Sequence, residues 1–188
     1  MVTEAEILDV LRTIPDPELP IGIVDLGIVH NIDVADRGSP NPGVPGVRMP
    51  EQTGVPVECD VSIEILPTFV GCPALRVIEE QVASKVGQLA GVGSVRIGIV
   101  YDPPWSVERI SPAGRQALAE LGVTVPLPSG ERLVSLGVQR RDAATPAACP
   151  FCGSTQTELE SAFGPTRCKM IYYCSACGNP FEHLRRLT

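Results

Sequence analysis

The chain has 188 residues, of which 44% are hydrophobic, and it carries a formal net charge of -7 at pH 7. This length and apolar content suffice for one domain of ordinary size and a small second module. The acidic balance disfavours nucleic-acid binding, which needs basic residues to neutralise phosphates. The apolar runs are too short to cross a bilayer, and the N-terminal residues lack the basic start and apolar stretch of a signal peptide. We therefore expect a globular, cytoplasmic protein that binds neither nucleic acid nor membrane.

The N-terminal third of the chain indicates a helix followed by two strands. A capping box and apolar residues at helical spacing predict a helix over residues 4 to 14. Residues 28 to 34 and 57 to 65 have the composition of strands, and the second places its apolar residues on one face. Because residues 36 to 56 are rich in proline and glycine, they predict a long hairpin loop between the two strands.

The middle of the chain predicts a helix, a strand and another helix. An apolar stripe at helical spacing follows Pro73, and Gly91 is expected to end this helix. Residues 95 to 99 alternate apolar and polar or small residues as a strand does. Ser111 stands before a proline and has the position of an N-cap, so it opens a short helix that Gly122 closes.

Four of the seven cysteines form two CxxC pairs near the C-terminus: Cys149, Cys152, Cys174 and Cys177. Two residues between cysteines let both sulfurs face one metal, and the glycine after each pair permits the tight turn this requires. The spacing predicts a structural zinc site with all four as ligands and no open position for catalysis. The alternative, redox dithiols or disulfides, fits less well because a redox CxxC pair stands on a helix after a strand.

The predicted fold class is α+β. Residues 1 to 125 form a small mixed sheet with helices on one face, residues 126 to 148 form a linker, and residues 149 to 188 form a four-cysteine zinc ribbon. The strands of the ribbon are expected at residues 157 to 162, 169 to 173 and 181 to 187.

Cys72 is the sharpest candidate for chemistry in the first domain. It precedes Pro73, so we expect it at the N-terminus of a helix, where unpaired N–H groups and the helix dipole favour the thiolate. A nucleophilic or metal-binding thiol and a small buried residue at a tight turn both fit this position. An enzyme acting through Cys72 would lack a general base. Cys59 shares one face of its strand with aliphatic residues, which indicates core packing.

The remaining polar candidates are weaker. Asp16 and Glu18 could hold iron beside a thiolate or could cap a turn, and the residues alone favour the second role. His30 and His183 have no neighbour at ligand spacing, so we expect both to be structural. Cys168 stands six residues before the second CxxC pair, a spacing that favours a free thiol over a zinc ligand. The usual catalytic signatures, such as GxGxxG, HExxH and GxSxG, are absent from the sequence.

Several segments, taken in order, carry a resemblance to a known family. They are DPEL at 16–19, IVDLGIV at 23–29, PTFVGCP at 67–73, DPPW at 102–105 and ISPAGR at 110–115. Together they resemble the iron-sulfur assembly domain of the SufT type. With the two CxxC segments and residues 161 to 169, the whole chain resembles the PaaD family of accessory components in bacterial phenylacetyl-CoA 1,2-epoxidase systems. The loop at 36 to 56 is longer and richer in proline than this family leads us to expect.

The resemblance implies a non-catalytic accessory protein of aerobic phenylacetate degradation, which assembles or delivers iron-sulfur or diiron centres to the oxygenase and reductase subunits. The alternative is a scaffold subunit of the oxygenase complex, and a homo-oligomer is also open. By motif match, Asp16, Glu18, Thr68 and Cys72 form the transfer site, and Cys168 is an auxiliary thiol. The implied cofactors are structural zinc and transient iron or an iron-sulfur cluster.

Overall fold

The computed structural model describes residues 2–19, 21–36, 58–126 and 147–186, so the predicted hairpin loop and linker fall almost entirely outside it. The elements are α1 (Glu4–Arg12), β1 (Val29–Asp36), β2 (Cys59–Ile65), α2 (Ala74–Gly87), β3 (Val92–Ile99), the 3-10 helix η1 (Val107–Arg109), α3 (Pro112–Glu120), β4 (Val123–Thr124), β5 (Thr157–Ser161), β6 (Lys169–Cys174) and β7 (Pro180–Leu184). No helix among the described residues has the length and apolar content that crossing a membrane requires.

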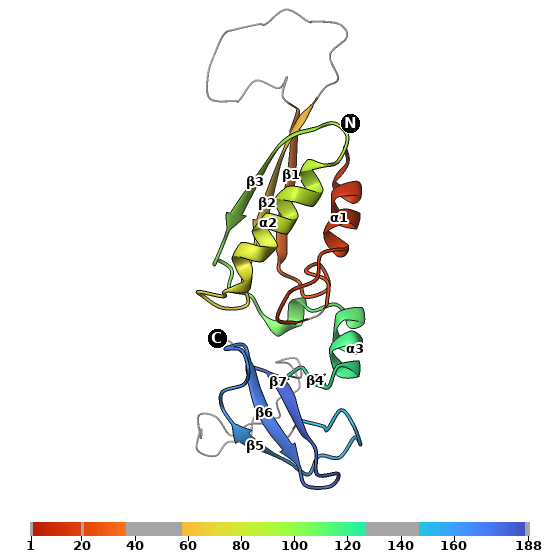
Figure 1. The fold of residues 1–188 in the computed structure, drawn as a ribbon, viewed down its shortest axis with the longest axis vertical. Helices are drawn as coiled ribbons and strands as arrows, with labels where there is room; N and C mark the ends of the chain where they lie inside the picture. The colour runs from red at the N-terminus through yellow and green to blue at the C-terminus, as the bar shows by residue number, and fades with distance from the viewer. Residues whose placement is uncertain (1, 20, 37–57, 127–146, 187–188) are drawn as a thin grey trace, which may run out of the picture.

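The first sheet has the strand order β1-β2-β3, with β1 antiparallel and β3 parallel to the central strand β2. Helices α1 and α2 lie together over one face of this sheet (Figure 1). The core between them takes the alternate buried residues of β2 and the buried stripes of the helices: Cys59, Val61, Ile63, Ile65, Ile7, Leu11, Ile78, Val82 and Val86. The structure thus confirms the mixed sheet with helices on one face.

The helix ends follow local signals with one exception. The capping box at α1 is formed, with Thr3 N–H donating to Glu6 Oε2 at 2.8 Å, and Ser111 Oγ accepts from Gly114 N–H at 2.9 Å at the start of α3. The prediction that Gly91 ends α2 is wrong, because the helix stops at Gly87. Gly91 has a φ of +88° and turns the chain into β3 instead.

The segment after β3 packs back onto the loop before β1. Trp105 Nε1–H donates to Leu26 O at 3.1 Å, and Arg109 Nε–H donates to Gly27 O at 2.8 Å. Gly27 has a φ of +73°, and a Cβ there would overlap the carbonyl oxygen of Arg109. The motifs at 23–29 and 102–115 therefore pack against each other through these contacts. Their packing holds the loop that carries Asp16 in place.

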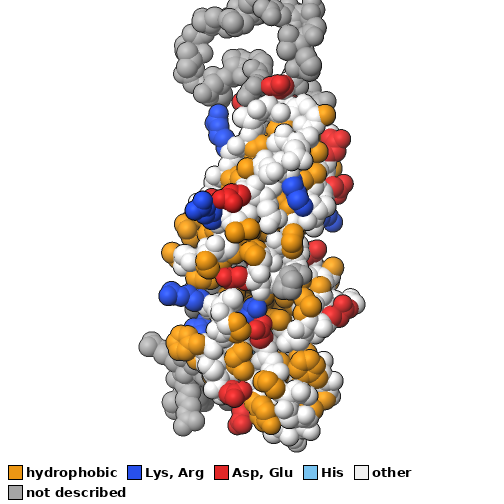
Figure 2. Space-filling view, viewed as in Figure 1, with side chains coloured by type: hydrophobic (Ala, Val, Ile, Leu, Met, Phe, Trp, Pro, Cys, Tyr) orange, Lys and Arg blue, Asp and Glu red, His pale blue; other side chains and the backbone are white. Residues whose placement is uncertain are grey.

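The second sheet has the order β4-β7-β6-β5 and lies at the opposite end of the molecule from α1 and α2 (Figure 1). Strands β5, β6 and β7 are those predicted for the ribbon. The sequence did not predict strand β4. It follows α3 directly, within the range predicted for the first domain, and it pairs in parallel with β7. Figure 2 shows acidic and basic side chains among apolar ones over the visible face.

The ribbon is tied to the rest of the chain by specific contacts besides the β4–β7 ladder. Glu182 N–H donates to Gly122 O at 3.3 Å, and Arg186 Nη1 lies 3.0 Å from Glu108 Oε1. These contacts join β7 and the end of the ribbon to the region of η1 and α3.

Candidate functional site

The four CxxC cysteines meet at one point in the ribbon. Their sulfur atoms all lie within 4.8 Å of one another. Cys149 Sγ is 3.7 Å from Cys177 Sγ, and Cys152 Sγ is 3.6 Å from Cys174 Sγ. Four sulfurs at about 2.3 Å from a tetrahedral metal would be about 3.8 Å apart. The geometry therefore fits a single metal ion, and the sulfur separations exceed the roughly 2.05 Å of a disulfide.

Each CxxC pair forms the same turn. Cys149 N–H donates to Ser154 O at 2.9 Å, and Gly153 N–H donates to Cys149 O at 2.9 Å. In the second turn, Cys174 and Gly178 donate the corresponding bonds at 3.0 and 2.8 Å. Gly153 and Gly178 have φ values of +72° and +73°, the left-handed region that favours glycine. The glycine after each pair thus has the role that the sequence predicted.

Hydrogen-bond donors point at the sulfurs. Asn179 Nδ2–H donates to Cys177 Sγ at 3.4 Å. This bond, together with a second from the backbone N–H of Asn179, lowers the pKa of the Cys177 thiol to about 6. Cys149 and Cys174 are buried. A cluster with buried sulfurs and donors aimed at them is suited to thiolates that carry negative charge onto a bound metal.

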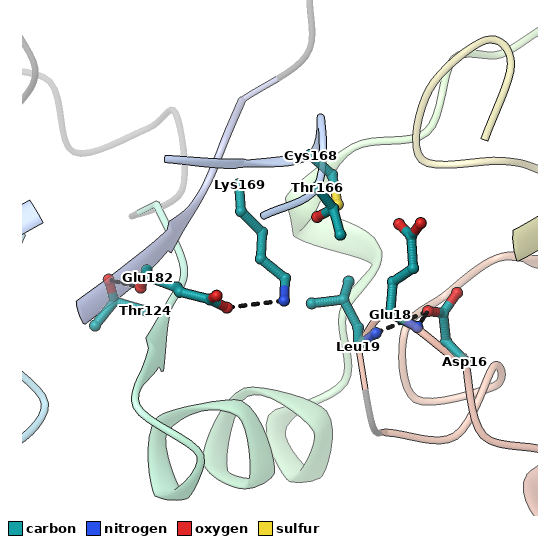
Figure 3. A network of polar contacts seen from close by, with 8 residues as sticks. All are labelled: Asp16, Glu18, Leu19, Thr124, Thr166, Cys168, Lys169 and Glu182. Atoms are coloured by element: carbon teal, nitrogen blue, oxygen red, sulfur yellow. Dashed lines mark hydrogen bonds and ion pairs between the residues drawn. The ribbon is translucent and has the colours of Figure 1, made fainter. Parts of the chain in front are cut away.

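A second group of polar side chains lies where the ribbon meets the Asp16 loop. Asp16 is buried, and its Oδ1 accepts from the N–H groups of Glu18 and Leu19, both at 2.8 Å (Figure 3). Asp16 therefore does cap the turn. The Glu18 carboxylate points away from this turn and faces a pocket shared with the ribbon.

Cys72 lies beside this loop, within electrostatic reach of Glu18 and Asp16. It precedes the N-cap of α2, Pro73, by one residue. The expectation of a stabilised thiolate is wrong: burial raises the pKa of Cys72 to about 11, and the two carboxylates add to the rise. A hydrogen bond from the Ala74 N–H lowers the pKa but is outweighed. Cys72 is thus a protonated thiol at neutral pH.

Cys168 comes from the ribbon and lies outside the four-cysteine cluster. Its side chain is buried, and Thr166 Oγ1 is 3.0 Å from its sulfur. Cys168 lies within electrostatic reach of Cys72 and Glu18. Burial raises the pKa of the Cys168 thiol, and the charge of Glu18 acts in the same direction. We call Asp16, Glu18, Cys72 and Cys168 the composite site, because two distant parts of the chain form it.

Lys169 brings a positive charge to the composite site. Its side chain is almost fully buried, and its ammonium nitrogen lies 2.8 Å from Glu182 Oε2 (Figure 3). Burial raises the pKa values of Asp16 and Glu18, and Lys169 partly offsets both shifts. A pocket of about 380 Å³ opens here between the two parts of the chain. It is lined by Glu18, Phe69, Val70, Gly71, Pro73, Pro165, Thr166 and Arg167.

The other candidates lie elsewhere or act structurally. Thr68 is buried in the loop that leads to Cys72, and the network of Figure 3 does not include it. Cys59 is fully buried in the first core, and its thiol donates to Gly91 O at 3.1 Å. His183 Nδ1 lies 2.7 Å from Thr124 Oγ1, and burial lowers the pKa of this histidine to about 4. His30 is in β1, and its Nδ1 is buried without a hydrogen-bond partner among the residues that the structure describes.

Sequence reasoning missed the part that the ribbon plays at the Asp16 loop. The sequence predicts Lys169 in a strand, within a small basic group that would offset the negative charge of a zinc tetrathiolate, and nothing in its spacing links it to Asp16. The one signal in the sequence is Cys168, whose position does not fit a CxxC pair. Cys168 lies outside the CxxC pattern and is followed by the buried Lys169. These two residues mark the face of the ribbon that meets the loops of the first sheet.

Comparisons with known proteins cover both parts of the chain. A family model described as iron-sulfur cluster assembly protein matches residues 4–97, and one described as PaaD zinc beta ribbon domain matches residues 135–185. An Escherichia coli (strain K12) protein, provisionally named as the D component of 1,2-phenylacetyl-CoA epoxidase, is 29% identical over 185 residues, which are 96% of this chain and 91% of that protein.

Shorter relatives match the N-terminal part. A Porphyromonas gingivalis protein named Fe-S protein maturation auxiliary factor is 32% identical over 120 residues, 64% of this chain and 91% of that protein. A solved Bacillus anthracis structure titled domain of unknown function DUF59 has 25% sequence identity and a TM-score of 0.43, and the match covers 61% of this chain and 90% of that chain. Because the family model described as iron-sulfur cluster assembly protein spans half of the 188 residues, and residues 135–185 match the PaaD zinc beta ribbon model, the chain belongs to the iron-sulfur cluster assembly protein family and is similar to the PaaD zinc beta ribbon domain at its C-terminal end.

Proposed function

We propose that this chain is a cytoplasmic, non-catalytic accessory protein that assembles or delivers an iron-sulfur or diiron centre to the oxygenase and reductase subunits of a phenylacetyl-CoA epoxidase system. The observation that carries the proposal is that the carboxylates of Asp16 and Glu18 lie close enough to Cys72 to raise the pKa of its thiol, although they come from a segment far from it in the sequence. Family membership and the similarity to the Escherichia coli epoxidase component over 96% of the chain support it.

The composite site has ligand types that suit a metal cargo. A thiol and carboxylates together suit a borderline divalent ion such as Fe(II), whereas an all-cysteine site selects zinc or an iron-sulfur cluster. The four ribbon cysteines are the one group among the described residues whose ligand atoms close to within 4.8 Å of one another. The groups of the composite site do not come together as closely among the described residues. We propose that they hold a metal cargo only transiently, as transfer to a partner requires.

The composite site lacks the features of an enzyme. Nucleophilic catalysis by cysteine needs a thiolate at working pH, and the pKa of Cys72 is raised to about 11. His183 contacts Thr124 and His30 lies in β1, so neither histidine is positioned as a base for Cys72. We therefore assign the catalytic reaction to the partner proteins. In this proposal the chain acts earlier, when their metal centres are assembled.

We propose zinc as the resident metal of the four-cysteine cluster, with Cys149, Cys152, Cys174 and Cys177 as ligands. The sulfur separations and the two matched turns fit it. Four protein ligands leave no open position, so the role of zinc is to hold the ribbon folded. The ribbon has a small core of its own, and two of the cysteines belong to it. In our proposal this ribbon (149–188) docks on the partners, and residues 1–125 form the other domain.

The test is to produce the oxygenase and reductase subunits in cells with and without this chain and to measure their iron content and epoxidase activity. We expect the iron content of at least one partner to fall when the chain is absent, while the partner polypeptides still accumulate. Partners with full iron that fail to associate would instead identify the chain as a scaffold. Partners that are equally metallated, associated and active in both cells would refute both roles.

A further inference from the structure

Two loops from distant parts of the chain line the pocket of about 380 Å³ between the ribbon and the Asp16 loop. The first loop is 69–73, before α2, and the second is 163–167, between β5 and β6. Val70 is 75% exposed and Phe163 is 76% exposed, the highest values among the large hydrophobic side chains that the structure describes. Exposed apolar side chains that gather beside a pocket indicate a contact surface for a partner. We call Val70, Phe163, Arg167 and this pocket the two-loop surface.

The pocket offers apolar walls to an incoming side chain. Phe69, Val70 and Pro73 line it from the first loop, and Pro165, two residues after Phe163, lines it from the second. Its volume falls in the range of about 300 to 1,000 Å³ that is usual for ligand pockets. Because the walls come from both parts of the chain, the N-terminal part alone does not form this pocket.

Arg167 supplies the charge of the two-loop surface. It is the one charged residue in the two loops, it is exposed, and it lines the pocket. No ion pair among the described residues involves Arg167. The acidic residue in the lining is Glu18, and the buried Lys169 already acts on its carboxyl group. In a chain with a net charge of -7, an exposed arginine without a partner carboxylate favours an acidic ligand.

The loop that carries Phe163 is held in place by its own hydrogen bonds. Ser161 Oγ–H donates to Phe163 O at 2.8 Å, and Phe163 N–H donates to Ser161 Oγ at 3.1 Å. Gly164 N–H donates to Lys169 O at 3.0 Å, and a Cβ on Gly164 would lie only 2.9 Å from Lys169 Cβ. The guanidinium carbon of Arg185 lies 5.5 Å from the centre of the Phe163 ring. The aromatic side chain is therefore positioned before a partner binds, which lowers the entropy lost on binding.

We propose that the two-loop surface binds an acidic, apolar segment of the receiving protein, whose apolar side chains contact Phe163 and enter the pocket while a carboxylate pairs with Arg167. Aromatic and arginine side chains are the residues that most often dominate the affinity of protein interfaces. This inference rests on the proposed function and deepens it, because it states how the chain recognises the protein that receives the metal centre.

The extent and position of the two-loop surface suit a transient partner. The loops 69–73 and 163–167 hold five residues each, whereas a stable dimer interface takes about 20 to 30 residues from each side. A second copy of this chain is therefore not the expected occupant. Gly71 and Pro73 both line the pocket and are the neighbours of Cys72 in the sequence. A segment bound there lies next to the loop of the proposed transfer site, as delivery requires.

The experiment measures the binding of the full-length, zinc-containing protein to each purified oxygenase and reductase subunit by isothermal titration calorimetry. We expect at least one subunit to bind, and we expect Arg167→Glu and Phe163→Ala each to weaken that binding about tenfold or more. Both side chains are exposed, so the variants should keep their thermal transition. Arg96→Glu makes the same charge change on β3, and Leu159→Ala shortens an exposed side chain on β5. Both controls should bind like the unaltered protein.

The salt dependence of binding tests the charged contact without a substitution. The dissociation constant of the unaltered protein should rise several-fold between about 0.05 and 0.5 M sodium chloride, and that of Arg167→Glu should not. Variants that bind as tightly as the unaltered protein, binding that salt does not weaken, or the absence of binding to every subunit would overturn the inference. The iron content of partners made in cells with and without the chain tests the proposed function separately. A fall in that iron content alongside any of these results leaves the proposed function standing.

A crosslink identifies the occupant directly. Phe163 is replaced by the photoreactive p-benzoylphenylalanine, the mixture with the bound subunit is irradiated, and the joined peptides are identified by mass spectrometry. We expect a segment of the subunit in which an aspartate or glutamate stands beside the crosslinked apolar residue. A crosslink to a second copy of this chain, or to a segment without acidic residues, would overturn the inference.

Discussion

Lys169 Nζ lies 2.8 Å from Glu182 Oε2, and this pair joins the two central strands of the ribbon on the side that faces the Asp16 loop. Lys169 is the more buried partner, with 8% of its side chain exposed against 27% for Glu182. The same ammonium group lowers the pKa values of Asp16 and Glu18 against the rise that burial causes. One cation of the ribbon thus balances acidic groups in both parts of the chain.

Replacing this cation should destabilise the protein. Lys169→Met keeps the apolar stem but leaves Glu182 partly buried and unpaired, so we expect the free energy of unfolding to fall by about 1 to 3 kcal/mol in urea titrations. Arg76→Met is the control, because the Arg76–Glu80 pair is exposed and should cost less than about 0.5 kcal/mol. Equal losses in the two variants would contradict the role of Lys169.

Zinc should be present at about one equivalent in protein purified without chelator. We expect Cys149→Ser combined with Cys177→Ser to abolish zinc binding and to unfold the ribbon, since the cluster supplies much of its core. Cys168→Ser should keep its zinc, because Cys168 lies outside the cluster. Metal analysis and circular dichroism measure both effects. Less than half an equivalent in the unaltered protein would rule out the assignment.

The free energy of unfolding should fall in acid because His183 resists protonation in the folded state. Burial lowers its pKa from 6.5 to about 4, so the folded state favours the neutral ring. The resulting stability is fully present above pH 6.5 and is lost as the pH falls toward 4. We expect the free energy of unfolding to decrease by about 2 to 3 kcal/mol over this range through this one group. Urea titrations at several pH values measure the slope.

His183→Asn is the control for this slope, since an amide oxygen can still accept from Thr124 but does not titrate. Thiolates of the metal cluster also take up protons in acid, and they do so in both proteins. The difference between the two curves therefore isolates His183. Curves that run parallel from pH 6.5 to 4 would show that the ring does not titrate as expected.

Cys72→Ser should separate cargo handling from folding. The exchange of sulfur for oxygen is small, and the side chain is only half-buried, so stability, zinc content and partner binding should change little. In cells, the oxygenase system should lose much of its iron-dependent activity. Cys59→Ser should do the reverse and cost about 1 to 2 kcal/mol of stability without affecting delivery, because a more polar hydroxyl, even with Gly91 O as acceptor, replaces a buried thiol in the core. Full activity of Cys72→Ser, with the complex intact, would favour a scaffold.

The N-terminal part should fold without the ribbon. The Porphyromonas gingivalis relative is matched over 91% of its length by 64% of this chain, and the first sheet has its own core with α1 and α2. A fragment of residues 1–126 should therefore show a cooperative thermal transition by circular dichroism. A fragment without any cooperative transition would show that the ribbon is needed for folding.

The local features of this fold are predictable and the long-range ones are not. The alternation in β2 and the capping box at Thr3 depend on neighbours in the sequence, and both appear as expected. The high pKa of Cys72 is not predictable in this way, because the sequence reveals only the helix N-terminus. The burial and the carboxylates that outweigh it arise from tertiary packing. Strand β4 is two residues long and carries no periodic signal, so its pairing with β7 could not be predicted.

The placement of β4 determines which segments of the chain tolerate insertions and deletions. Only Leu121 and Gly122 separate α3 from β4, and β4 pairs directly with β7, so the chain enters the ribbon's sheet before residues 127–146 begin. The orientation of the ribbon is thereby set upstream of that segment. Insertions or deletions between 127 and 146 can then accumulate without moving Cys168 relative to Cys72, whereas a single residue inserted between α3 and β4 would shift the whole ribbon.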